Sequence, residues 1–154
     1  MLKDTYKRKI DYLRISVTDR CNLRCIYCMP EEGIAQKAHG DIITFEEIER
    51  FVKIAAGIGI DKIRFTGGEP LVRKDITKLI ASILKIAHID DLSLTTNGIF
   101  LAQYAKELKG AGLKRINISL DTLNEDKFKS ITRNGLLHDV LDGIDEAKRL
   151  GFFI

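Results

Sequence analysis

Four short segments of the chain alternate apolar and polar side chains with a period of two, as strands with two different faces do. These predicted strands cover residues 12–18, 63–66, 92–96 and 115–121. Each is followed by a loop and then by a stretch in which apolar residues recur at helical spacing. The pattern therefore predicts a series of strand–loop–helix units.

Helix signals follow each predicted strand. Thr44 and Glu47 have the form of a capping box, and the helix behind them is expected to end near Gly57 or Gly59. Asp75 is expected to cap the next helix with its side chain. Further helices are predicted over residues 101–108, from residue 124 and around residues 140–150, and residues 152–154 have the pattern of an opening fifth strand.

Strands that alternate with helices favour a parallel sheet, because parallel neighbours need crossovers of this length. Buried parallel strands usually read as nearly continuous apolar runs, yet each of these strands carries a polar face that requires water or a ligand against it. The polar side chains are Arg14, Ser16 and Thr18; Arg64 and Thr66; Ser93, Thr95 and Asn97; and Arg115, Asn117, Ser119 and Asp121. We predict an α/β fold for residues 1–154: an incomplete TIM-like parallel (β/α) barrel with four βα units and the start of a fifth strand.

Composition narrows the class of protein. The 154 residues are 45% hydrophobic and 31% charged, which is typical of a globular domain. A formal net charge of +3, with basic and acidic residues interspersed, does not favour nucleic-acid binding. No apolar stretch approaches the ~20 residues of a membrane-spanning helix, and the amino terminus has no apolar signal core. A cytoplasmic protein without a membrane partner is expected.

All three cysteines fall in one segment with the spacing Cys-x3-Cys-x2-Cys: Cys21, Cys25 and Cys28. Three thiolates indicate a metal centre in which one coordination position is free for a ligand other than protein. A zinc site completed by His39 or by another chain is one interpretation. A 4Fe–4S cluster whose open iron binds the amine and carboxylate of S-adenosylmethionine (SAM) is the other.

Further motifs connect the cysteine segment to a known family. Tyr27 precedes the last cysteine, and Gly67-Gly68-Glu69-Pro70 follows the second predicted strand. With the cysteine spacing, these residues resemble the radical SAM superfamily. Five stretches, 18–22, 28–30, 65–75, 94–98 and 115–121, are similar to the molybdenum cofactor biosynthesis protein A family, the GTP 3′,8-cyclases. The resemblance covers nearly the whole chain.

The resemblance implies a role for nine residues. Cys21, Cys25 and Cys28 would ligate a 4Fe–4S cluster; Tyr27, Gly68 and Ser119 would contact SAM; and Arg14, Arg64 and Thr95 would contact GTP. Arginines on neighbouring strands can make charge-assisted hydrogen bonds to phosphate oxygens, although an internal ion pair, for instance with Asp121, would also explain them. No general acid or base is assigned.

The resemblance also implies what the reaction would be and what else it would need. SAM would be cleaved to a 5′-deoxyadenosyl radical that abstracts H3′ of GTP, in the first step of molybdenum cofactor biosynthesis, with an electron donor to reduce the cluster and with a homodimer as an open possibility. Family members add a C-terminal domain with a second cluster. This chain is therefore expected to be an N-terminal portion that is inactive by itself.

Two other functions are compatible with the same residues. One is a different radical SAM enzyme, such as a peptide maturase, which would keep the cysteine and glycine motifs without needing the two arginines. The other is a non-enzymatic zinc or iron–sulfur binding domain.

Overall fold

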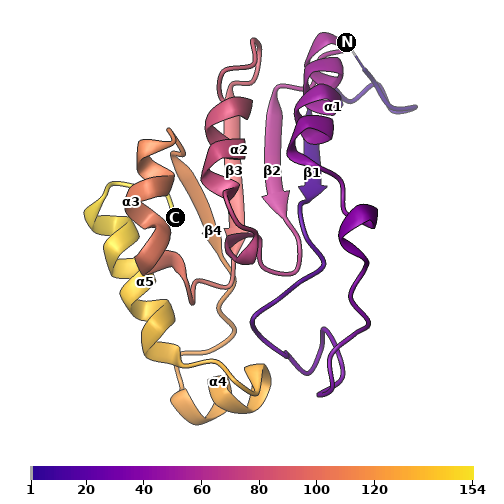
Figure 1. Ribbon diagram of the computed structural model, residues 1–154. Helices are drawn as coiled ribbons and strands as arrows, with labels where there is room; N and C mark the ends of the chain where they lie inside the picture. The colour runs from indigo at the N-terminus through magenta and orange to yellow at the C-terminus, as the bar shows by residue number, and fades with distance from the viewer. Residues whose placement is uncertain (1) are drawn as a thin grey trace.

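A computed structural model describes residues 2–154 and contains one sheet of four parallel strands in the order β1-β2-β3-β4 (Figure 1). The strands are β1 (Tyr12–Ser16), β2 (Lys62–Thr66), β3 (Asp91–Thr96) and β4 (Arg115–Ile118). Strands that are consecutive in the sequence pair with each other, with a helical crossover between them. The predicted α/β arrangement of four units is confirmed.

Within residues 2–154, three α-helices connect the strands and two more follow β4. They are α1 (Phe45–Gly57), α2 (Ile76–Ile83), α3 (Leu101–Gly110), α4 (Glu125–Thr132) and α5 (Leu137–Arg149), with short 3-10 turns η1 (His39–Asp41) and η2 (Pro70–Val72). Helices α1, α2, α3 and α5 lie along one face of the sheet (Figure 1). Only α4 lies apart, beside the loops at the carboxyl ends of the strands. Among residues 2–154, no helix is long and apolar enough to cross a membrane.

The N-terminal cap of α1 matches the sequence pattern, whereas that of α2 departs from it. Thr44 caps α1, accepting from the backbone of Glu47 at 3.2 Å while the Glu47 carboxylate accepts from the Thr44 backbone at 2.8 Å. The capping box is therefore confirmed. Asp75 stands at the N-cap of α2, but its side chain makes no capping hydrogen bond and instead pairs with Lys78 at 2.9 Å. Its backbone has φ 61°, which turns the carboxylate away from the helix start.

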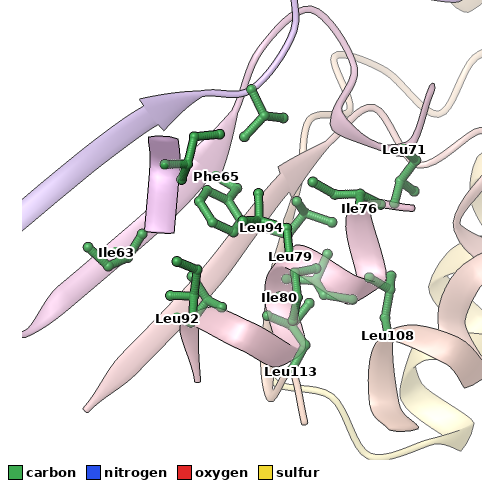
Figure 2. Packing of buried hydrophobic residues seen from close by; sticks show 14 of the residues in the cluster. Ile63, Phe65, Leu71, Ile76, Leu79, Ile80, Leu92, Leu94, Leu108 and Leu113 are labelled. Atoms are coloured by element: carbon green, nitrogen blue, oxygen red, sulfur yellow. The ribbon is translucent and has the colours of Figure 1, made fainter. Parts of the chain in front are cut away.

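The hydrophobic core lies between the sheet and the helices (Figure 2). Strand residues such as Ile63, Phe65 and Leu94 point into it and meet Leu79 and Ile80 of α2, and all five are fully buried. The opposite face carries the polar residues of the strands. This division follows from the period-two alternation, because successive side chains of a strand point to opposite faces.

The predicted fifth strand is present as a single pairing. Phe153 forms an isolated parallel bridge with Arg115, in which the Ile116 amide donates to the Phe153 carbonyl and the Phe153 amide donates to the Lys114 carbonyl, both at 2.9 Å. The next parallel strand of the barrel thus begins beside β4, as the sequence pattern indicates.

Two helical glycines provide a test of the packing between α5 and α3. A Cβ on Gly143 would lie 2.8 Å from the carbonyl oxygen of Gly98 and 2.9 Å from Leu101 Cβ, whereas a Cβ on Gly110 would meet nothing within 4 Å. We expect Gly143→Ala to lower the free energy of unfolding by ~1–3 kcal/mol, because the contact is overpacked. Gly110→Ala is expected to leave it unchanged or raise it by up to ~1 kcal/mol. Urea unfolding measures both, and equal effects would contradict this packing.

Candidate functional site

A pocket of about 340 Å³ opens at the carboxyl ends of the strands and collects eight of the nine residues predicted for the site. These are Arg14, Cys21, Cys25, Tyr27, Cys28, Gly68, Thr95 and Ser119. They come from β1, from the cysteine loop behind it, and from the ends of the other three strands. Arg64, the ninth, does not line the pocket and lies in register with Arg14 on the neighbouring strand.

The cysteines occupy a loop that turns on itself at the pocket. The amides of Cys28 and Met29 both donate to the Cys25 carbonyl, at 2.9 and 3.2 Å, and the Leu23 amide donates to Cys21 Sγ at 3.4 Å. All three thiols are free. Burial raises the pKa of the Cys21 thiol and that of the less deeply buried Cys25 thiol. Because a metal binds the thiolate form, metal binding at these thiols would release protons.

The donor set fits a 4Fe–4S cluster. The three thiols line one pocket, and thiolates are the ligands that hold such clusters in proteins. Within residues 2–154, no group of three His, Cys, Asp or Glu residues is arranged to hold a single metal ion. The side chain of His39, considered above as a zinc ligand, lies outside the described part of the chain.

Gly67 and Gly68 allow two backbones to approach each other. The Gly68 amide donates to the Thr18 carbonyl and the Glu69 amide to the Arg20 carbonyl, both at 2.8 Å, and a Cβ on Gly68 would collide with the Arg20 carbonyl. The glycine pair therefore fastens the turn after β2 to the start of the cysteine loop. The glycine pair thus has a structural role and also lines the pocket. A contact between Gly68 and SAM stays a prediction.

The side chain of Glu69 connects this turn to β3. It is only 1% exposed and accepts hydrogen bonds from the Leu71 amide, the Thr96 hydroxyl and the Asn97 amide at 3.0, 2.8 and 2.7 Å. Burial raises the pKa of Glu69, and the three donors offset part of that shift. The sequence singled out Glu69 only as part of a motif, so this buried carboxylate was missed as a positioning group.

Asn97 carries the connection on to the cysteine loop. Its Nδ2 donates to Asn22 Oδ1 at 2.8 Å and lies 3.9 Å from Cys21 Sγ. The polar faces of the strands had indicated only that Asn97 shares a surface with Ser93 and Thr95. Its position directly after β3, where polar side chains of parallel sheets gather, was the one available signal.

Tyr27 bridges the pocket from the cysteine loop to the loop after β4. Its hydroxyl donates to Asp121 Oδ2 at 2.8 Å, and burial together with this carboxylate raises the pKa of Tyr27. Asp121 is thereby the partner of Tyr27. The alternative in which Asp121 forms an ion pair with Arg14 or Arg64 is wrong.

The two arginines predicted to contact GTP stand side by side without a carboxylate. Arg14 and Arg64 are register partners on β1 and β2, and neither forms an ion pair within residues 2–154. Arg64 Nε donates to Ser93 Oγ at 3.3 Å, and its guanidinium lies 5.5 Å from the ring of Tyr12. By contrast, Arg115 on the same face pairs with Asp91.

Three buried polar atoms on this face have no hydrogen-bond partner within residues 2–154. They are Thr95 Oγ1, one of the predicted site atoms, Asn117 Oδ1 and Arg115 Nε. Buried polar groups are usually satisfied, and an orphan costs on the order of 1–3 kcal/mol unless water or a ligand reaches it. The polar face can thus accept a polar ligand.

Comparison with known proteins identifies the class. Residues 15–154 match the family model described as the Radical SAM superfamily, and the chain belongs to that superfamily. Radical SAM enzymes use a 4Fe–4S cluster and SAM, so the two predicted cofactors follow from membership.

The more particular likeness is to enzymes named GTP 3′,8-cyclase. The relative from Peptoclostridium acidaminophilum is 59% identical over 98% of this chain, and that from Alkaliphilus metalliredigens is 59% identical over 97%. These stretches make up 46% and 47% of the two relatives. The chain thus spans about half the length of the curated relatives that it matches.

Solved structures agree on the fold. Methylornithine synthase (PylB) matches 92% of this chain with a TM-score of 0.71 at 15% identity, and the match covers 42% of that protein. Streptococcus suis SuiB bound to S-adenosylmethionine also gives 0.71, at 21% identity, over 92% of this chain and 30% of its own. At such identities the likeness concerns architecture alone, and it confirms a partial barrel of the radical SAM type.

The Glu69 network can be tested with Glu69→Gln. The amide would turn an N–H group toward at least one of the three donors, so we expect a loss of ~1–3 kcal/mol in the free energy of unfolding. Thr122→Ala, which removes one hydrogen bond from an exposed loop, is the control. It is expected to cost clearly less.

The sign of the pH dependence follows from the raised pKa. As pH falls through the folded pKa of Glu69 toward its ordinary value near 4.5, the folded state binds the proton before the unfolded state does, which stabilises the wild type. Glu69→Gln lacks this gain. The stability gap between the two should therefore be wider near about pH 5 than near about pH 8, and a narrower gap would contradict the assignment.

Proposed function

We propose that the chain is the N-terminal part, residues 1–154, of the radical SAM core of a GTP 3′,8-cyclase, which acts in the first step of molybdenum cofactor biosynthesis. Relatives of that name that are 59% identical over nearly all of this chain support the proposal. The stretch they share with it contains all nine predicted site residues.

The site residues receive the following roles. Cys21, Cys25 and Cys28 hold the 4Fe–4S cluster; Tyr27, Gly68 and Ser119 bind and orient SAM; and Arg14, Arg64 and Thr95 bind GTP. When bound, the cluster supplies the electron that splits SAM into methionine and a 5′-deoxyadenosyl radical able to remove H3′ of GTP. The residues of the chain bind and orient the reactants and keep water away from them.

The observation that carries the proposal is the arginine pair on β1 and β2. Arg14 is exposed and Arg64 is half-buried, so water solvates part of both charges. Two adjacent guanidinium groups without a carboxylate nevertheless repel each other. A polyanion such as a triphosphate relieves that repulsion and offers oxygens for bidentate hydrogen bonds.

Thr95 adds a polar contact beside the arginines. Its unpartnered Oγ1 lies on the strand next to that of Arg64 and lines the same pocket as the cysteines. A hydroxyl in this position can bond to a sugar or phosphate oxygen of the nucleotide. The nucleotide would thus extend from the arginines toward the cluster, which is the arrangement that hydrogen abstraction requires.

The setting of the protein is part of the same proposal. Three thiols that must stay free for a cluster favour a reducing compartment, the cytoplasm. An external electron donor would reduce the cluster, and a homodimer is compatible with the role.

Nucleotide binding tests the arginine pair. Arg14→Ala and Arg64→Ala are each expected to weaken GTP binding by about ten- to a hundredfold, because each removes charge-assisted hydrogen bonds. Arg50→Ala, at an exposed arginine of α1, is the matched control. Affinity for guanosine should not respond to any of the three changes. Unaltered GTP affinity in both Arg14→Ala and Arg64→Ala would leave another radical SAM function, such as peptide maturation, as the better assignment.

Anaerobic reconstitution tests the metal centre. The chain is expected to bind about four iron and four sulfide per molecule. Cys21→Ser, Cys25→Ser and Cys28→Ser should each reduce that content, whereas Ser130→Ala on the exposed side of α4 should not. Uptake of one zinc ion in place of iron and sulfide would instead support the non-enzymatic zinc domain.

A further inference from the structure

The connection between α4 and α5 lies against the cysteine loop and is bonded to both of its ends. Arg133, the C-cap of α4, donates from one guanidinium nitrogen to the carbonyl of Arg24 at 2.6 Å and to the carbonyl of Met29 at 3.0 Å. These two carbonyls flank the segment from Cys25 to Cys28. A single side chain therefore closes the base of the turn that presents two of the three thiols.

The last turn of α4 and Asn134 add further bonds to the loop. The amides of Arg24 and Ile26 donate to the carbonyls of Thr132 and Ile131 at 3.2 and 2.9 Å. Asn134 Nδ2 donates to the Asn22 carbonyl at 2.9 Å. The cysteine loop contains no strand of the sheet. These bonds therefore satisfy backbone groups that would pair with a neighbouring strand in a sheet.

Arg133 occupies a backbone conformation that does not suit its residue type. Its φ is 65° and its ψ is −45°, outside the regions that residues with a Cβ prefer. Glycine would adopt this conformation at lower cost. A strained residue that persists is usually held by its surroundings and is associated with a function. The two carbonyl contacts give a reason for an arginine in a place that favours glycine.

We propose that Arg133 is a positioning residue for the metal centre, which fixes the Cys25–Cys28 turn by holding the carbonyls of Arg24 and Met29. The guanidinium holds the two carbonyl oxygens on either side of the turn, while inside the turn the amides of Cys28 and Met29 donate to the Cys25 carbonyl. The proposal rests on the proposed function in that these thiols carry the cluster. It assigns to Arg133 no contact with SAM or GTP.

Arg133→Gly separates this role from general stability. The change removes the guanidinium bonds and relieves the backbone strain together, and these act on stability in opposite directions, so the midpoint of urea unfolding is expected to change little. The reconstituted cluster, in contrast, should be lost to a chelator about tenfold faster or more, because two hydrogen bonds from a charged group are removed. The electron paramagnetic resonance signal of the reduced cluster should also broaden or shift, since the thiolates become less uniformly placed.

Two further variants complete the comparison. Arg133→Lys keeps the charge and can reach one carbonyl, and it should recover part of the cluster's lifetime and signal shape. Lys129→Ala, which removes an exposed cation one turn earlier on α4, should behave as the wild type. Wild-type lifetime and signal in Arg133→Gly would overturn the positioning role.

Hydrogen exchange in the metal-free protein tests the positioning role independently of the cluster. The Cys28 and Met29 amides should exchange faster in Arg133→Gly, by about tenfold, while amides of the sheet are unchanged. Unchanged exchange at these two amides would overturn the inference. Faster exchange in a chain that takes up neither iron nor sulfide would support the role of Arg133 in the loop and overturn the proposed function instead.

Discussion

The carboxylate of Glu69 joins loops that belong to different strands, because its two oxygens accept hydrogen bonds from the turn after β2 and from the end of β3. Asn97, held by Glu69 through its backbone, reaches Asn22 with its side chain. The geometry at Cys21 therefore depends on a buried acid that touches no thiol. Burial makes these bonds strong, since water cannot compete for them.

The sheet separates two environments. On one face, side chains such as Phe65 and Leu94 pack against helices and stabilise the fold; on the other, Arg14, Arg64 and Thr95 are available to a ligand. A strand can serve both needs because consecutive side chains point in opposite directions. Substitutions on the polar face can thus alter binding with little effect on the core, which is how parallel barrels support many chemistries.

Much of the architecture could be predicted from the sequence, whereas the connections around the site could not. Period-two alternation locates β1 to β4 because burial selects residue type directly at every second position. The contacts of Arg133 leave no such trace, since the carbonyls that it binds are identical at every residue. Asp75 had the residue type of a cap, but its left-handed backbone directs it elsewhere. Tyr27 and Asp121 are 94 residues apart, and nothing local indicates that they meet.

The tethers of the cysteine loop have a consequence for synthesis of the chain. The thiols leave the ribosome first. Asn97, Asp121 and Arg133, which contact their loop, follow 75, 94 and 109 residues after the residues that they bind. A ribosome that has made only the first unit carries three thiols whose relative positions are not yet defined. Closing such long loops costs entropy that the later contacts must offset. A cluster would therefore meet three thiols in defined relative positions only after translation has passed the end of α4.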